Sequence, residues 1–216
     1  MREAMKKNWK SMIIAAVIIL LPMLVGVVLW DRLPDPMATH WDFEGNANGW
    51  TGRTFTVFGI PLVMLALHMV CLLVTESDRN SCGQNPKLKR IMYCVVPVVS
   101  LLLCGTIYPS ALGMKMPMQT MALLCLGVML LIIGNYMPKC TPNKWMGIRV
   151  PWTFESEENW TATHRFASRV YVAIGLACFA CAFIPSAKLG MAITVMVIAG
   201  CLSPIAYSYL HHRRHG

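Results

Sequence analysis

The chain has 216 residues, of which 56% are hydrophobic and only 13% charged, and it carries a formal net charge of +9. Because an ordinary soluble domain has about 25% charged residues, this composition excludes intrinsic disorder and disfavours a water-soluble globule. The apolar residues fall in long blocks that approach the roughly 18 to 20 residues needed to cross a bilayer. We therefore expect an all-α integral membrane protein.

Six apolar blocks predict about six transmembrane helices, at residues 12–30, 55–75, 91–112, 118–137, 170–186 and 190–210. The blocks group into three two-span segments, at residues 1–75, 76–137 and 138–216. The first segment contains a loop motif between its spans, and the last begins with a long polar loop. Six spans place both termini on the same side of the membrane.

The positive charges predict which side that is, since Lys and Arg are retained in the cytoplasm. Fifteen of the nineteen Lys and Arg residues lie on the side of the N-terminus, and the other side holds only Arg32, Arg53, Lys115 and Lys188. The prediction is N-in and C-in, with the lipid bilayer as a partner. The charge does not form one patch, so we expect no direct binding of nucleic acid.

The loop after the first span is the only long external connection. From His40 to Glu44 polar and aromatic residues alternate, which predicts a strand. Gly45 to Gly49 predicts a turn, after which Trp50 is expected to fold back against Trp41. The result is a short extracellular hairpin-like loop whose aromatic rings lie at headgroup level.

The polar face of this strand permits a second interpretation. Alternation puts His40, Asp42 and Glu44 on one face, and imidazole and carboxylate groups are ligands of zinc and non-haem iron. Metal sites depend on geometry, so a solvated face with a pH-sensitive His40 is the preferred interpretation and the metal site the weaker alternative.

The long loop after the fourth span is predicted to be cytoplasmic. Thr153 is expected to N-cap a helix whose first turns carry Glu155, Glu157 and Glu158, the charge that a helix dipole favours there. Further on, Trp160, His164 and Ala167 share one helix face, while Arg165 and Arg169 share another. These patterns predict an amphipathic helix at the interface that runs into the fifth span.

Arg149 lies in a rigid part of this loop, with Pro151 just beyond it and Trp145 and Trp152 on either side. One interpretation is a headgroup anchor. The other is that the Arg149 guanidinium grips a carboxylate of this loop or of a partner, which a planar guanidinium does better than an ammonium. Spacing alone favours the headgroup anchor.

His68 is the one ionisable residue well inside a predicted span. An intramembrane ionisable residue is a functional-site candidate because burying it is costly. The preferred interpretation is that His68 is hydrogen-bonded to a backbone carbonyl freed by Pro61 or another kink.

Two motifs resemble known families. The loop run NKWMGIRVPW, from Asn143 to Trp152, followed by Trp160 and Thr163-His164-Arg165, resembles the signature of the SdpI-type immunity proteins of Gram-positive bacteria. The pattern Leu33-Pro34, His40-Trp41, Gly45 and Gly49-Trp50 is similar to the small N-terminal domain of unknown function that commonly precedes that signature. Both occur in the expected order, and together they cover most of the chain.

This resemblance implies a multi-pass protein of the Gram-positive plasma membrane that protects its cell against a secreted membrane-active peptide toxin. It also implies signalling, with a cytoplasmic transcriptional regulator as the expected partner. The residues expected to bind toxin or partner are His40, Trp41, Gly45, Trp50, Asn143, Gly147, Arg149, Pro151, Trp152, Trp160, His164 and Arg165.

Two other functions stay open. A transporter of small solutes or ions is the first alternative, although no Asp or Glu lies within the predicted spans to couple ions. A metal-dependent membrane enzyme using His40, Asp42 and Glu44 is the second. The C-x-x-C pair Cys178 and Cys181 lies in a span without access for redox chemistry. We therefore expect no enzyme and no cofactor.

Overall fold

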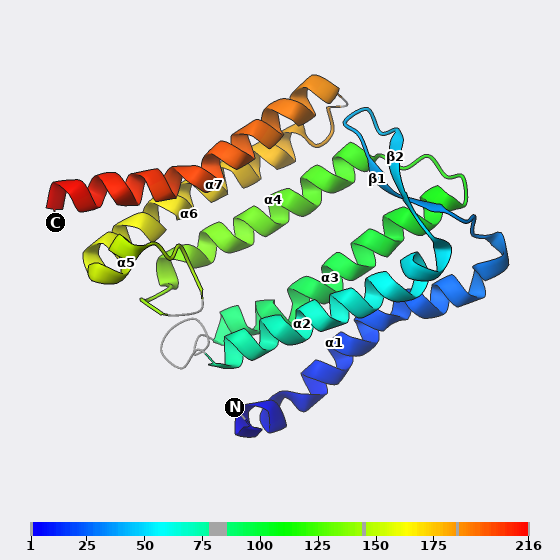
Figure 1. Ribbon diagram of the computed structural model, residues 1–216, viewed down its shortest axis with the longest axis horizontal. Helices are drawn as coiled ribbons and strands as arrows, with labels where there is room; N and C mark the ends of the chain where they lie inside the picture. The colour runs from blue at the N-terminus through cyan, green and yellow to red at the C-terminus, as the bar shows by residue number, and fades with distance from the viewer. Residues whose placement is uncertain (1, 78–85, 144–145, 185, 216) are drawn as a thin grey trace. The chain divides into compact units, whose positions relative to one another are not determined.

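The computed structural model describes residues 2–77, 86–143, 146–184 and 186–215 (Figure 1). It is almost entirely helical, with one two-stranded antiparallel sheet. The first part of the chain forms α1 (Arg2–Val28), the short helix η1 (Trp30–Arg32), β1 (Met37–Trp41), β2 (Ala47–Thr51), the π-helix η2 (Phe55–Gly59), α2 (Ile60–Ser77) and α3 (Pro86–Ala111). The second part forms α4 (Met118–Tyr136), η4 (Met137–Lys139), α5 (Pro151–Glu155), α6 (Glu157–Cys181) and α7 (Ala187–His215).

Five helical segments among the described residues are long and apolar enough to cross a membrane. They are Asn8–Val28, Phe55–Thr75, Ile91–Ala111, Met118–Lys139 and Ala187–Arg214. These segments coincide with five of the six spans predicted from the sequence. The prediction of an all-α integral membrane protein is therefore confirmed.

The sixth predicted span, at residues 170–186, coincides with the second half of α6. From Val170 to the end of α6 at Cys181 the helix rises only about 18 Å at 1.5 Å per residue, which is less than the hydrocarbon core. The first half of α6 contains Glu157, Glu158 and Arg165. A sixth crossing therefore requires these charged turns to lie at the headgroups, and the number of six spans stays a prediction.

The chain divides into two compact units. Of the described residues, unit 1 contains 2–77 and 86–118, and unit 2 contains 119–143, 146–184 and 186–215. The central two-span segment predicted at residues 76–137 is thus divided, because α3 packs with α1 and α2 whereas most of α4 belongs to unit 2.

Unit 1 is a three-helix bundle with the hairpin at one end. Ser100 Oγ donates to the Ile19 carbonyl at 3.3 Å, and Tyr108 Oη donates to the Pro22 carbonyl at 2.9 Å, so polar bonds join α3 to α1. Gly26 of α1 allows η2 to approach closely, since a Cβ there would lie 2.6 Å from Val57 Cγ1. At the hairpin end, Met37 of β1 is buried against residues of η2 and α3.

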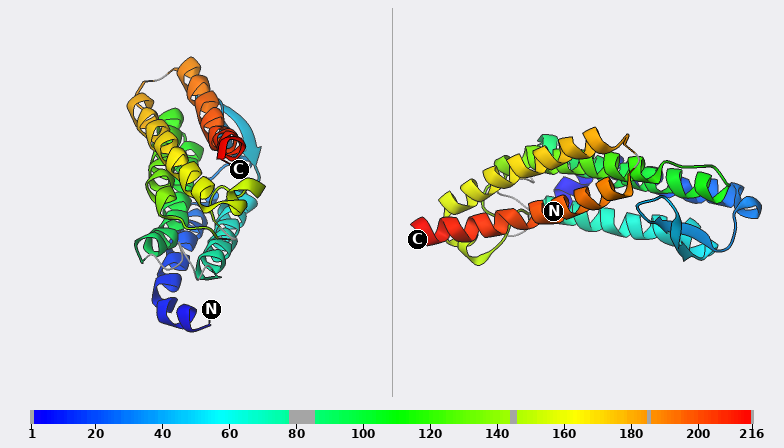
Figure 2. Two further views of the ribbon diagram at one scale, coloured as in Figure 1. Left: turned by 90° about the vertical axis from the view of Figure 1, so that its left-hand side faces the viewer. Right: turned by 90° about the horizontal axis from the view of Figure 1, so that it is seen from above.

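Unit 2 packs α4, α6 and α7 around one apolar cluster that includes Leu130, Ala167 and Ile174. Figure 2 shows α6 and α7 side by side in two further views. Glycines bring α4 and α6 together, because a Cβ on Gly127 would lie 3.1 Å from the Gly175 carbonyl oxygen. Thr120 Oγ1 donates to the Ala182 carbonyl at 2.8 Å and joins the ends of the same two helices.

The orientation of the bundle is testable by reporter fusions. With N-in and C-in topology, fusions after Gly45 and after Gly113 are expected to report an external location, and fusions after Glu157 and after Gly216 an internal one. Paired alkaline phosphatase and green fluorescent protein fusions measure this directly. An internal location for Gly45 would contradict the assignment of every loop.

Candidate functional site

The predicted cytoplasmic signature begins with a turn that Asn143 holds. The Asn143 Oδ1 accepts a hydrogen bond from the Met146 N–H at 2.7 Å, and Nδ2 donates to the Thr141 carbonyl at 2.9 Å. Lys144 and Trp145 of the signature lie outside the described residues. Asn143 therefore shapes the local backbone, as amide side chains commonly do in turns.

Gly147 brings the loop against α6. Its φ is +104°, a left-handed conformation that other residues adopt only with strain. A Cβ at this position would clash with His164 Nε2 and lie 3.2 Å from Trp160 Cζ2. Both the backbone angle and the close approach therefore require glycine here.

His164 fastens this loop to α6 through both ring nitrogens. Nδ1 lies 2.7 Å from the Trp160 carbonyl oxygen, and Nε2 accepts from the Ile148 N–H at 3.1 Å. A carbonyl only accepts and a backbone N–H only donates. These partners therefore assign the proton to Nδ1 and leave Nε2 unprotonated. Burial lowers the pKa of His164, and the hydrogen bond to Trp160 opposes this in part. The clamp thus depends on a neutral imidazole.

Trp160 is the buried centre of the same site. Its ring is stacked on His164, with centroids 4.3 Å apart and an interplanar angle of 18°. The indole Nε1 donates to the Cys140 carbonyl at 2.8 Å, so the start of the loop is also tied to α6. Sequence analysis placed Trp160, His164 and Ala167 on one face and Arg165 and Arg169 on the other. The structure confirms this: the first three are buried and the two arginines are exposed.

The predicted cap of the amphipathic helix is wrong. The sequence indicated Thr153 as the N-cap of one helix, but two helices form and Ser156 caps the second by accepting from the Asn159 N–H at 3.2 Å. Thr153 Oγ1 instead accepts from the Val150 N–H at 3.1 Å and closes the first turn of α5. Pro151 starts α5, where a missing N–H has no consequence. Val150 has extended backbone just before α5, and the extended backbone of Ser156 separates α5 from α6.

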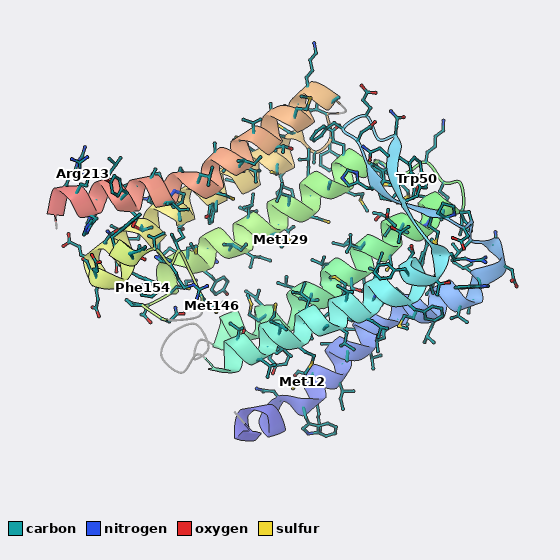
Figure 3. All side chains as sticks on the ribbon, in the orientation of Figure 1. Met12, Trp50, Met129, Met146, Phe154 and Arg213 are labelled. Carbon is teal, nitrogen blue, oxygen red and sulfur yellow. The ribbon has the colours of Figure 1, made fainter. Side chains whose placement is uncertain are left out.

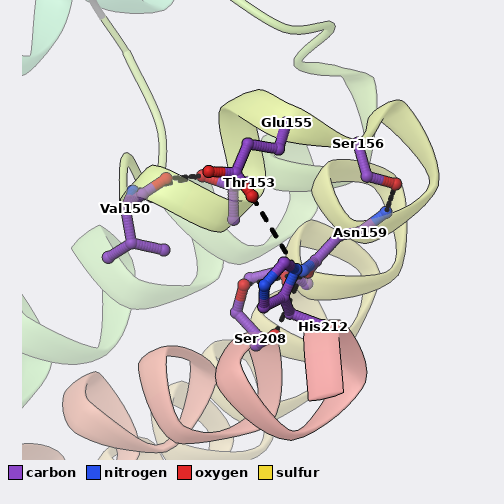
Figure 4. A network of polar contacts seen from close by, with 8 residues as sticks. Val150, Thr153, Glu155, Ser156, Asn159, Ser208 and His212 are labelled. Atoms are coloured by element: carbon purple, nitrogen blue, oxygen red, sulfur yellow. Dashed lines mark hydrogen bonds and ion pairs between the residues drawn. The ribbon is translucent and has the colours of Figure 1, made fainter. Parts of the chain in front are cut away.

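A buried polar network that sequence analysis did not find joins α6 to α7 (Figure 4). Asn159 Nδ2 donates to the Ser208 carbonyl at 3.1 Å, and Asn159 Oδ1 accepts from both Ser208 Oγ and Thr163 Oγ1 at 2.9 Å. All three residues are buried. The available signal was the i, i+4 spacing of Asn159 and Thr163, but Ser208 is 49 positions away and no local pattern connects it.

The remaining signature residues lie nearer the surface. Trp152 packs edge-on against Tyr209, with ring centroids 5.4 Å apart, and stacks over His212, with ring centroids 6.5 Å apart. The His212 Nδ1 lies 3.9 Å from Glu155 Oε2. Arg149 is exposed, and its grip on a carboxylate stays a prediction. The loop, α5 and the end of α7 thus form one connected assembly within unit 2.

The second candidate site is the hairpin of unit 1. Strand β1 ends at Trp41, and the register pairs Trp41 with Ala47 and Trp50 with Ala38, so Trp50 does not fold back on Trp41 as predicted. Figure 3 shows Trp50 on the hairpin, where it is 58% exposed. Trp41 instead packs against the apolar cluster beneath the hairpin. The two tryptophans therefore face different surroundings.

The predicted polar face of His40, Asp42 and Glu44 does not form, because Asp42 and Glu44 lie in the turn after β1. Asp42 Oδ1 accepts the N–H groups of Glu44 and Asn46, both at 2.9 Å, and these bonds lower the pKa of Asp42. Gly45, with φ +86°, completes the turn. Among the described residues no group of three or more His, Cys, Asp or Glu is placed to hold a metal ion. The metal alternative is therefore not supported.

Arg53 was counted in the sequence only as a charge, but it fixes the base of the hairpin. Its Nη1 donates to the carbonyls of Trp30 and Leu33 at 2.9 and 3.1 Å, and its guanidinium carbon lies 4.4 Å from the centre of the Trp30 ring. The Arg53 N–H donates to Asp35 Oδ1 at 3.0 Å. These contacts join the two chain segments that enter and leave the hairpin.

His68 differs from its prediction. It is 1% exposed, and neither ring nitrogen has a hydrogen-bond partner within the described structure, so no carbonyl freed by Pro61 satisfies it. Its ring meets that of Tyr93 edge-on, with centroids 6.3 Å apart.

Comparisons with known proteins match both sites. Residues 139–208, which contain the signature loop, α6 and most of α7, match the SdpI/YfhL protein family. Residues 17–65, which contain the hairpin, match the domain of unknown function DUF1648. Immunity protein SdpI of Bacillus subtilis (strain 168) is 26% identical over 216 residues, covering 97% of this chain and 98% of that protein. No solved structure matches. The resemblance drawn from the motifs is therefore confirmed: the chain is a multi-pass cell-membrane protein with an SdpI/YfhL family region preceded by a DUF1648 domain.

Proposed function

We propose that this chain is an immunity protein that protects its cell against a secreted, membrane-active peptide toxin. The observation that carries the proposal is the similarity to Immunity protein SdpI, which extends over 97% of the chain and thus includes both the hairpin and the signature loop. In this proposal the hairpin meets the toxin on the outside. The signature loop lies on the other side of the membrane, because an odd number of spans separates the two sites.

The finer proposal is that the signature loop signals to a cytoplasmic regulator. Its support is the rigidity of the site: His164, Trp160 and the Asn159 network join the loop to α6 and α7. A partner that contacts Arg149 or Arg165, both exposed, would thus act on a surface coupled to two helices. We propose no catalytic role, since the polar side chains of this site are already used to fasten its backbone.

The test is expression in a toxin-sensitive Gram-positive host, followed by challenge with secreted peptide toxins. Protection relative to an empty vector at matched growth supports an immunity role, and lack of protection against every toxin tested counts against it. A transporter remains the alternative. Uptake or release of ions and small solutes by proteoliposomes distinguishes the two, because protection without flux excludes transport as the mechanism.

Replacement of Trp50 is expected to weaken protection. Its side chain is 58% exposed on the hairpin and so is available to a partner, and aromatic side chains that become buried in an interface often dominate recognition. Trp50→Ala should lower the toxin concentration that stops growth by about tenfold, the effect of losing about 1.4 kcal/mol of binding, without a change in membrane abundance. The matched control is Trp9→Ala, since Trp9 is 53% exposed but lies on the predicted inner side. Equal effects of the two changes would contradict a role for the hairpin in recognition.

A further inference from the structure

A groove of about 550 Å³ lies between α1 and α3 in unit 1, apart from both candidate sites. Asn8, Ser11 and Tyr93 form its polar lining, and Ile18, Val98 and Leu101 belong to its apolar lining. The groove lies within the candidate spans Asn8–Val28 and Ile91–Ala111. Val98 and Leu101 are exposed, so the medium beside them is lipid hydrocarbon.

The groove lining changes from polar to apolar along the helices, as a bilayer does from its headgroups to its hydrocarbon core. Asn8 and Ser11 occupy the first turns of the span, and Ile18 lies about 15 Å further along the helix, at 1.5 Å per residue. On α3, Tyr93 likewise precedes Val98 and Leu101. The groove is thus polar near the predicted cytoplasmic surface and apolar toward the membrane centre, as a phospholipid is polar at its glycerol and phosphate and apolar along its chains.

Along the sequence, the residues at the polar end of the groove follow two basic helix starts. The first turns of α1 and α3 contain seven Lys or Arg and one acidic residue, Glu3; the basic ones are Arg2, Lys6, Lys7, Lys10, Lys87, Lys89 and Arg90. The N-terminus of each helix also has a partial positive charge. An anionic headgroup is therefore favoured there over a zwitterionic one.

His68 lies next to one of the residues that line the groove but does not line the groove itself. Its ring contacts Tyr93, which lines the groove, and neither of its nitrogens is hydrogen-bonded within the described structure. Buried imidazoles without partners are costly in the membrane interior and indicate functional positions. Among the described residues, this unsatisfied imidazole is thus separated from the groove by the Tyr93 ring.

We propose that this groove binds one anionic phospholipid of the cytoplasmic leaflet. The headgroup lies at the basic starts of α1 and α3, the glycerol region lies beside Asn8, Ser11 and Tyr93, and an acyl chain follows Ile18, Val98 and Leu101. This site is separate from the proposed toxin and regulator surfaces, so it stands or falls independently of the immunity role.

Native mass spectrometry of the full chain in mild detergent tests the proposal, with phosphatidylglycerol and phosphatidylcholine as probes. The wild type is expected to retain one phosphatidylglycerol per chain and at least tenfold less phosphatidylcholine. Leu101→Trp, which fills the groove, is expected to lower retention of phosphatidylglycerol at least tenfold. Leu103→Trp is the matched control, since Leu101 and Leu103 lie on the same helix and are each 40% exposed, but only Leu101 lines the groove.

Lys10→Gln provides a second variant at an exposed position outside the core, and it is expected to lower retention of phosphatidylglycerol but not of phosphatidylcholine. Equal retention of the two lipids by the wild type would overturn the proposal, as would equal retention by the two tryptophan variants, which indicates only annular lipid. A dimer that Leu101→Trp alone abolishes would assign the groove to a second copy of the chain instead.

Discussion

Gly147→Ala is expected to produce the largest loss of stability of any single methyl addition in the signature loop. The change forces a residue with a side chain into φ +104°, which costs about 1–3 kcal/mol. The new Cβ also meets His164 Nε2, and the ring cannot rotate away without breaking its bonds to Trp160 and Ile148. Overpacking of this kind costs about another 1–3 kcal/mol. Unfolding in detergent and membrane abundance measure the loss.

Gly113→Ala is the control for the backbone contribution. Gly113 has φ +85°, and a Cβ there would have nothing within 4 Å. This variant is expected to lose only the strain energy and to keep full protection in the toxin challenge. If Gly113→Ala and Gly147→Ala lower the midpoint of unfolding equally, the close approach of the loop to α6 makes no contribution.

His164→Leu is expected to have the second-largest effect, because it removes both hydrogen bonds of the clamp. The Ile148 N–H loses its acceptor, at a cost of about 1–3 kcal/mol for a group that stays buried and unsatisfied. The Trp160 carbonyl loses its side-chain partner but still accepts the backbone N–H of residue 164 within α6, so this second loss is smaller. His164→Gln keeps an acceptor in reach of the Ile148 N–H and is expected to be milder. A leucine variant as stable as the glutamine variant would show that the hydrogen bonds are dispensable.

The same clamp predicts a dependence on pH. Burial holds the pKa of His164 below its ordinary value of about 6.5, so the unfolded chain binds a proton more readily than the folded chain. The stability that the neutral ring supplies is fully present above about pH 6.5 and declines as the pH falls below that value. Unfolding of the wild type and of His164→Gln at about pH 7.5 and about pH 5.5 isolates this contribution. An identical pH response of the two proteins would contradict it.

The sequence determined the class of protein, five of its spans and the two segments that matter. Membrane insertion depends on hydropathy over about twenty consecutive residues, which is a local property. The prediction at residues 55–75 therefore coincides with Phe55–Thr75. The buried face of α6 was likewise visible, since Trp160, His164 and Ala167 repeat at helical spacing.

Local patterns failed wherever a neighbouring turn competed for the same residues. Alternation from His40 to Glu44 favoured a strand, but Asp42 stabilises a turn by accepting two backbone N–H groups. Thr153 is a residue type that commonly caps helices, but Ser156 is the N-cap of α6 because the chain is extended between α5 and α6. Each error came from choosing between two local hydrogen-bonding patterns that the same residue type supports.

Which polar groups contact each other depends on how the helices pack. Ser208 satisfies Asn159 across 49 positions, Arg53 bonds to Trp30 across 23, and Ile148 donates to a histidine 16 positions away. No periodic pattern in the sequence predicts these pairs, because the packing of whole helices determines which side chains face each other. The sequence located His68 inside a span. Helix packing places its imidazole beside Tyr93, without a hydrogen bond in the described structure. Burial in lipid or protein removes the water that would otherwise satisfy the ring nitrogens.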